Sequence, residues 1–169
     1  MIEINNTTKQ KIKAQKITTV AERFLRAYRK SGYEVSVAIV GPARMKNLNK
    51  TYRQSDKTTD VLSFPAGKIP RGAGRPVFGS GPYLGEVIIN ISETKKVEKY
   101  REIIGEKKEG ADKKLIRPDE VFYFLLVHGL LHLLGYTDET NKKREEMIKL
   151  GKKFLANFYN KNPSNEGFL

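Results

Sequence analysis

One segment, residues 121–134, restricts the fold more than any other part of this sequence, because nearly all of its residues are apolar. Pro118, followed by Asp119 and Glu120, is typical of a helix start, and Gly135 is typical of a helix end. A helix that is apolar on all sides must be surrounded by other elements. The segment is too short to span a bilayer. We therefore expect it to be the central helix of a folded domain.

Strand and helix patterns alternate before this helix, and a further helix is predicted after it. Short apolar runs predict strands, and apolar residues at helical spacing predict helices. The predicted strands are residues 2–5, 35–40, 60–65 and 85–91, of which 35–40 and 60–65 are expected to be buried. The predicted helices are residues 9–30 with Gly32 as the stop, a helix that begins at Pro42, residues 92–104 with Ser92 as the cap, and residues 141–158.

These elements predict one α/β (α+β) domain over residues 1–160 and a flexible C-terminal tail over residues 161–169. The domain is expected to have a small mixed β-sheet of three or four strands, with about five helices on its faces. The chain has 169 residues, which suits a single core.

Charge and cysteine usage limit the partners and the chemistry. The net charge of +13 attracts phosphate-rich partners, although a generally lysine-rich proteome is an alternative cause, and charge alone does not separate RNA, DNA and anionic membrane. The chain has no cysteine, so any zinc ligand is a histidine or a carboxylate. Because no segment resembles a signal peptide or a membrane span, we expect a cytoplasmic protein without a membrane partner.

The two histidines of the chain, His128 and His132, lie four residues apart on the expected central helix. Residues at this spacing share a helix face, so both imidazoles can bind one zinc ion. Gly135 allows the chain to turn back, which brings Asp138 within reach as a third ligand. Three protein ligands leave a fourth position for water, as in catalytic zinc sites. We predict one zinc ion per chain, bound by His128, His132 and Asp138.

Other interpretations of these residues remain open. Either histidine can be a hydrogen-bonded core residue, Asp138 can cap the last helix, and Glu139 can compete as the third ligand. Gly129 occupies the position of the catalytic glutamate in the protease motif H-E-x-x-H. A zinc hydrolase of peptide or amide bonds is therefore disfavoured.

Three blocks of the sequence resemble the YbeY family of bacterial endoribonucleases and rRNA maturation factors. Residues 128–136 (HGLLHLLGY) are similar to its signature H-G-x-L-H-L-x-G-Y-D-H. Residues 48–53 (LNKTYR) with Asp56 and residues 59–65 (TDVLSFP) are similar to its L-N-x-x-Y-R … D-x-x-T-D/N-V-L-S-F-P stretch, and residues 85–89 (GEVII) to its G-D-I-x-I strand. The blocks occur in family order.

The resemblance implies a zinc-dependent, single-strand-specific endoribonuclease that acts in 16S rRNA processing and ribosome quality control. It implies that the partners are precursor rRNA and the ribosomal subunit, with ribosomal proteins or GTPase assembly factors as further candidates and no small-molecule cofactor. It also implies catalytic roles for Arg53, His128 and His132. A guanidinium at Arg53 can clamp a scissile phosphate and offset its developing charge.

The third ligand departs from the family pattern. The family has histidine where this chain has Asp138, and aspartate where it has Thr137. A carboxylate can bind zinc, but its charge lowers the Lewis acidity of the ion and favours harder metals. The alternative function is therefore a catalytically weak, metal-stabilised ribosome-assembly or RNA-binding factor.

The remaining expectations concern contacts with RNA and structural residues. Lysine and arginine side chains in residues 66–83 and 105–116 are expected to hold the RNA backbone. The sequence has no aromatic platform typical of RNA-recognition domains, so base specificity is expected to be low or supplied by a partner. Asp60 and Ser63 are expected to hold their strand and its turn, and Tyr52 to belong to the core.

Overall fold

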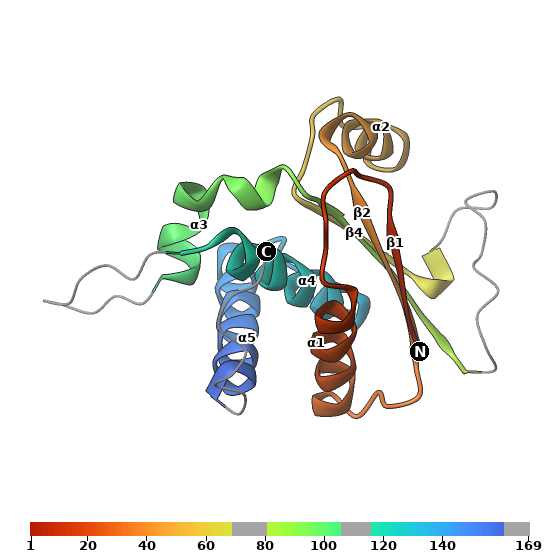
Figure 1. Cartoon of the computed structure of the whole chain (residues 1–169), viewed down its shortest axis with the longest axis vertical. Coiled ribbons are helices and arrows are strands. Elements are labelled where there is room, and N and C mark those ends of the chain that lie inside the picture. The colour runs from red at the N-terminus through yellow and green to blue at the C-terminus, as the bar shows by residue number, and fades with distance from the viewer. Residues whose placement is uncertain (69–80, 106–115, 161–169) are drawn as a thin grey trace, which may run out of the picture.

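The computed structural model describes residues 1–68, 81–105 and 116–160 and shows a four-stranded sheet with helices on both faces (Figure 1). The strands are β1 (Ile2–Asn6), β2 (Glu34–Val40), β3 (Val61–Pro65) and β4 (Tyr83–Asn90). The α-helices are α1 (Ala14–Ala27), α2 (Pro42–Arg53), α3 (Val97–Ile104), α4 (Pro118–Leu133) and α5 (Asn141–Asn160), with short 3-10 turns at Ala66–Lys68 and Glu93–Lys95. The predicted α/β fold with a small mixed sheet is confirmed.

The sheet has the strand order β1-β2-β4-β3, in which the first three strands are parallel and β3 is an antiparallel edge. In register, Val37 pairs with Val87, and Val61 with Ile89. The inner strands β2 and β4 are mostly apolar and buried because both of their faces are covered, whereas the edge strand β1 alternates between half-buried and exposed residues. Strand β3 is less buried than expected: only Leu62 is fully buried in it, because an edge strand has a neighbour on one side alone.

Alternation of side chains along the strands divides the core into two unequal parts. The larger part contains Val37, Val87 and Ile89 and is covered by α1, α4 and α5. The smaller part contains Ala38 and Ile88 and is covered by α2. Figure 1 shows α2 on the opposite side of the sheet from the other three helices.

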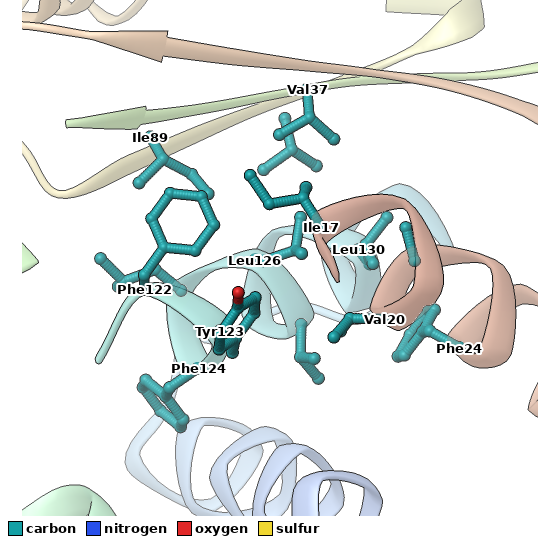
Figure 2. Packing of buried hydrophobic residues seen from close by; sticks show 14 of the residues in the cluster. Ile17, Val20, Phe24, Val37, Ile89, Phe122, Tyr123, Phe124, Leu126 and Leu130 are labelled. Atoms are coloured by element: carbon teal, nitrogen blue, oxygen red, sulfur yellow. The ribbon is translucent and has the colours of Figure 1, made fainter. Parts of the chain in front are cut away.

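Helix α4 lies at the centre of the larger core, as its sequence predicts. Nearly all of its residues are buried, and it contacts the sheet, α1, α3 and α5. Figure 2 shows Phe122 of α4 directed at Ile89 of the sheet, with Ile17 of α1 beside Leu126. Each such side chain contributes about 1.5–3 kcal/mol on burial. The helix is thereby fixed on all sides, which gives a rigid support to any side chain at its C-terminal end.

Two predicted helices differ from those observed, and local hydrogen bonds explain both differences. Helix α1 ends at Ala27 rather than near Gly32, because Arg29 adopts a left-handed conformation (φ 56°) and the Lys30 amide donates to the Leu25 carbonyl (2.7 Å). This is the six-to-one bond of a Schellman stop. The predicted helix 92–104 is broken into the turn Glu93–Lys95 and α3, and Ser92 makes no side-chain cap.

Several expectations fall on residues outside the described ranges. Most of the loop 66–83, including Arg71 and Arg75, and most of the segment 105–116 belong there, as does the predicted tail 161–169. No helix in the described part of the chain is both long enough and apolar enough to cross a membrane.

Candidate metal centre

The last turns of α4 bring His128 and His132 together. Their rings lie 4.7 Å apart, centroid to centroid, in an edge-to-face arrangement, and their Nε2 atoms are separated by 3.1 Å. Both side chains are mostly buried, with 14% and 21% exposed. The spacing of four residues on one helix face thus directs the same nitrogen of each ring towards one point.

A tight turn at the C-terminal end of α4 returns the chain towards the two Nε2 atoms. The Tyr136 amide donates to the Leu131 carbonyl (3.1 Å), and the Gly135 amide donates to the His132 carbonyl (3.0 Å). Gly135 has φ +94°, a left-handed conformation that costs an L-residue about 1–2 kcal/mol. The turn also places the Tyr136 carbonyl 2.9 Å from His132 Nδ1.

The returning segment directs Asp138 towards both imidazoles. Its Oδ2 lies 3.6 Å from His128 Nε2, and its Oδ1 lies 3.9 Å from His132 Nε2. One ligand atom from each residue lies within 4.8 Å of the other two. The structure therefore brings together the three residues that the sequence predicts as metal ligands, and they are the one such group among the described residues.

The distances fit a tetrahedral zinc site. Two ligands at 2.0–2.1 Å from one zinc ion are about 3.3–3.4 Å apart at the tetrahedral angle. The three separations of 3.1, 3.6 and 3.9 Å lie on both sides of that value. A shift of a few tenths of an ångström in the half-exposed Asp138 side chain would bring all three ligand atoms within bonding distance of one cation.

The protonation pattern also suits metal binding. His132 Nδ1 donates its proton to the Tyr136 carbonyl, which leaves the Nε2 lone pair for the centre, as in most metal-binding histidines. Burial lowers the pKa of His128, and the neighbouring His132 lowers it further, while Asp138 and Asp60 oppose the shift. A neutral imidazole at neutral pH is a ligand that does not first have to lose a proton.

Gly129, between the two histidines, allows α4 to approach the sheet. A Cβ atom there would lie 2.5 Å from Val87 Cγ1 and 3.2 Å from Ser63 Oγ. A glutamate at this position, as in the H-E-x-x-H proteases, would therefore require the helix to move away from β4. The sheet packing gives a physical reason for the absence of that general base.

Arg53, the third predicted catalytic residue, is the last residue of α2 and is exposed. Helix α2 covers the face of the sheet opposite to α4, and no contact among the described residues joins Arg53 to the three ligands. The preceding Tyr52 packs edge-to-face on Phe64 of β3 at 5.2 Å but is only partly buried, so it lies at the border of the smaller core rather than inside it. The catalytic role of Arg53 stays a prediction.

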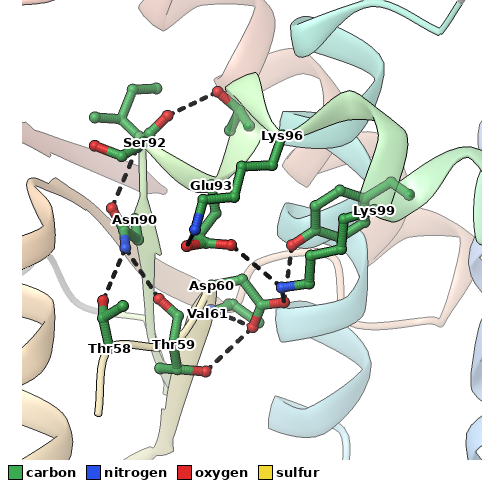
Figure 3. Close-up of polar contacts among 12 residues, drawn as sticks. Thr58, Thr59, Asp60, Val61, Asn90, Ser92, Glu93, Lys96 and Lys99 are labelled. Carbon is green, nitrogen blue, oxygen red and sulfur yellow. Dashed lines mark hydrogen bonds and ion pairs between the residues drawn. The ribbon is translucent and has the colours of Figure 1, made fainter.

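Asp60 is the centre of a polar cluster rather than a reactive group (Figure 3). Its Oδ1 accepts from the Val61 amide (2.9 Å) and from Thr59, and its Oδ2 accepts from the Tyr100 hydroxyl (2.9 Å) and Lys99 Nζ (3.3 Å). Burial alone would raise the pKa of Asp60, but the Tyr100 hydrogen bond and the Lys99 charge outweigh it and hold that pKa below its usual value.

The Asp60 cluster agrees with the predicted structural role of this residue, whereas Ser63 does not make the expected bonds. The Ser63 hydroxyl is buried and has no hydrogen-bond partner among the described residues. Sequence reasoning also missed the partners of Asp60. Tyr100 and Lys99 lie in the predicted helix 92–104, but the sequence pattern gives neither of them a polar partner.

These observations define a small α/β protein with an open centre of two histidines and one carboxylate at the end of a buried helix. The chain belongs to the family of Endoribonuclease YbeY: the family model matches residues 3–159. The sequence resemblance is thus confirmed.

Relatives named Endoribonuclease YbeY align with most of the chain. The Aquifex aeolicus protein is 36% identical over 141 residues, which are 83% of this chain and 80% of that protein. The Leptospira interrogans protein is 39% identical over 126 residues, 69% of this chain and 80% of that protein. The Myxococcus xanthus protein is 34% identical over 143 residues, but this chain spans only 42% of its length.

A solved structure supports the fold. The solution structure of TM1509 from Thermotoga maritima superposes with a TM-score of 0.56, covers 98% of this chain and 94% of its own, and is 24% identical.

Proposed function

We propose that this chain is a zinc-dependent endoribonuclease that cleaves single-stranded RNA in the cytoplasm, in 16S rRNA maturation and ribosome quality control. The observation that carries the proposal is the convergence of His128, His132 and Asp138 at the end of a rigid helix. Membership of the Endoribonuclease YbeY family supports RNA as the substrate. The net charge of +13 supports a polyanionic partner.

The centre directs two imidazole nitrogens and one carboxylate towards one point. When bound there, zinc supplies a Lewis acid that can polarise a phosphoryl oxygen and lower the pKa of water. The protein's part is to keep these atoms in place: α4 is packed on all sides, and the Tyr136 carbonyl fixes the His132 ring through its Nδ1 hydrogen. Arg53 is proposed to offset charge on the scissile phosphate.

The proposed partners are precursor rRNA and the ribosomal subunit, with ribosomal proteins or GTPase assembly factors as further candidates. The described cations on α2 and α5 suit the RNA backbone. Lys46 and Lys50 are exposed on α2, and Lys149 and Lys153 are exposed on α5. Such contacts bind phosphate without reading the sequence.

A second candidate function is favoured by one observation, the carboxylate of Asp138 in the ligand set. A negative ligand lowers the net charge of a bound ion and weakens its action on a phosphodiester. The chain would then be a metal-stabilised RNA-binding or ribosome-assembly factor with little catalysis of its own.

Cleavage assays distinguish the two candidates. Purified protein would be incubated with labelled single-stranded RNA and with the same RNA in a duplex, as purified, after chelation, and after zinc or manganese is restored. An endoribonuclease is expected to cut the single strand internally, lose activity on chelation and regain it with metal. RNA binding without cleavage under every metal condition would favour the second candidate.

A further inference from the structure

A cavity of about 300 Å³ lies between the end of α3, the first half of α4 and the last turns of α5. Its described walls include Ile104, Phe124, Leu155 and Tyr159, and Lys152 and Lys153 belong to its lining. Specific ligand sites have this character: apolar and aromatic walls with a few polar groups, in volumes from about 300 Å³ upwards. None of the residues assigned above to the metal centre lines it.

The cavity and the metal centre are nevertheless neighbours on the same helix. Glu120, Phe124, His128 and His132 follow one another at four-residue intervals, so they form one stripe along α4. Glu120 and Phe124 line the cavity, whereas His128 and His132 belong to the metal centre. Phe124 joins the two sites directly, because its ring stacks on His128 at 6.0 Å with an interplanar angle of 28°.

The chemistry of the lining selects the kind of occupant. Tyr159 is partly exposed and offers aromatic surface to a flat ring, while Phe124 is largely buried and contributes an apolar wall. Aromatic surface is the usual way in which proteins hold a base of single-stranded nucleic acid. Glu120 also lines the cavity, but its Oε2 already accepts from the Arg117 amide (2.9 Å), so it forms part of the wall and does not select a base. Lys153 is exposed and, among the described residues, makes no ion pair, so it suits a phosphate.

Lys152 Nζ already donates to the Gly105 carbonyl (3.3 Å), which leaves Lys153 for a phosphate. We propose that this cavity binds one nucleotide of single-stranded RNA, the base inside and the phosphate at Lys153, next to the nucleotide that reaches the metal centre. The inference rests on the proposed function, because it requires that RNA bound at the metal centre extends along α4 to the cavity. It adds a base-binding subsite to a chain whose sequence predicts no aromatic RNA-recognition platform. One such subsite would give a preference for single strands, since a paired base is not free to enter.

The test uses a residue that borders the cavity from outside the core. Ala156 lines the cavity and is exposed on α5, so Ala156→Trp is expected to fill the cavity without removing a core contact. Asn157 is the next residue, is equally exposed and does not line the cavity, so Asn157→Trp is the matched control. Thermal unfolding of both variants shows whether either substitution disturbs the fold.

Nucleoside monophosphates make the binding test independent of cleavage. Adenosine and uridine 5′-monophosphate would be titrated into the full chain, with backbone amide resonances as the readout. We expect shifts at Gly105, Lys153 and Ala156 with about millimolar affinity. Ala156→Trp is expected to weaken binding by about tenfold or more, and Asn157→Trp to leave it unchanged. Inorganic phosphate alone should not reproduce the shifts.

A charge pair gives a second readout that does not depend on filling the cavity. Lys153→Ala is expected to weaken binding of the monophosphates and to reduce its salt dependence, whereas Lys142→Ala, which removes an equal charge from the exposed start of α5 outside the cavity, should not. Absent shifts near Ala156, equal shifts with inorganic phosphate, or equal losses from both tryptophan variants would overturn the nucleotide subsite even if the protein cleaves RNA. Binding at the cavity without any RNA cleavage would instead overturn the proposed function and leave the subsite standing.

Discussion

Asp60 and Asp138 are two carboxylates with opposite surroundings. Asp60 faces hydrogen-bond donors from four groups: the Val61 amide, the Thr59 and Tyr100 hydroxyls and the Lys99 ammonium. Asp138 faces the Nε2 atoms of two imidazoles, one of which has its proton on the opposite nitrogen. The first carboxylate accepts from four protein donors, whereas the second faces two imidazoles, of which His128 alone can donate to it.

The difference separates a structural carboxylate from a ligand. Removing a satisfied carboxylate leaves its donors unpaired and lowers stability. Removing a carboxylate that faces two imidazoles leaves at most one donor unpaired, and mainly removes affinity for a cation. Mutation of Asp60 should therefore mainly lower the free energy of unfolding, whereas mutation of the metal centre should mainly lower metal affinity.

The largest effect is expected at His132, through metal binding. His132→Ala should lower zinc affinity on the order of 1000-fold, because four-ligand zinc sites derive about 10–16 kcal/mol from their ligands together. Zinc competition against a chromophoric chelator measures the loss. The metal-free unfolding midpoint should change far less than the midpoint in zinc. Unchanged zinc affinity in His132→Ala would show that His132 does not bind the ion and would contradict the metal centre.

The next effect is expected at Asp60, in stability. Asp60→Ala should lower the free energy of unfolding by about 3 kcal/mol, since the buried Tyr100 hydroxyl and the Val61 amide lose their acceptor. Urea unfolding of the metal-free protein measures this loss. Zinc affinity should remain within a few-fold of wild type. A large loss of zinc affinity with little loss of stability would reverse the two roles.

The low pKa of Asp60 predicts a pH dependence of stability. The Tyr100 hydrogen bond and the Lys99 charge outweigh burial and lower the pKa of Asp60 in the folded protein. The ionised group therefore contributes stability fully above the usual aspartate pKa of about 4, and this contribution is lost as pH falls through the lower folded value. The stability difference between wild type and Asp60→Asn should shrink below about pH 4. A difference that grows on acidification would contradict the assignment.

Tyr100→Phe should have a smaller effect. It removes one of the four donors to Asp60 and keeps the buried ring, so we expect a loss of about 1–2 kcal/mol. The pKa of Asp60 should rise, since the main opposing hydrogen bond is gone, which NMR titration of the carboxyl carbon can detect. An unchanged pKa would mean that Tyr100 does not hold this carboxylate.

Lys99→Ala should give the smallest effect. Its ammonium lies 3.3 Å from Asp60 and 3.2 Å from Glu93, but half of the side chain is exposed, so we expect at most about 1 kcal/mol. The loss should diminish in high salt, in contrast to that of Tyr100→Phe. Equal salt dependence of the two variants would contradict this distinction.

The sequence was sufficient to predict the supports of the metal centre. Residues 121–134 are apolar on all sides, which predicts a central helix, and the spacing of His128 and His132 on that helix predicts their convergence. Gly135 predicts the turn that returns the chain towards Asp138. These features depend on residues close together in the sequence, so local patterns specify them.

The features that could not be predicted depend on bonds that no pattern encodes. The stop of α1 uses a left-handed arginine, Arg29, where the sequence offers Gly32 nearby. Asp60 meets Tyr100 across 40 positions, and only the assembled fold brings them together. The cavity beside Phe124 likewise arises where three helices meet, and no single helix shows it.

The most direct test of the metal centre measures bound zinc and RNA cleavage together, in wild type, Asp138→Ala and Asp138→His. The account predicts one zinc per wild-type chain with chelator-sensitive cleavage, loss of both in Asp138→Ala, and retention of zinc in Asp138→His. If Asp138→Ala holds zinc as tightly as wild type and cleaves RNA at the same rate, the two-histidine, one-aspartate centre is contradicted.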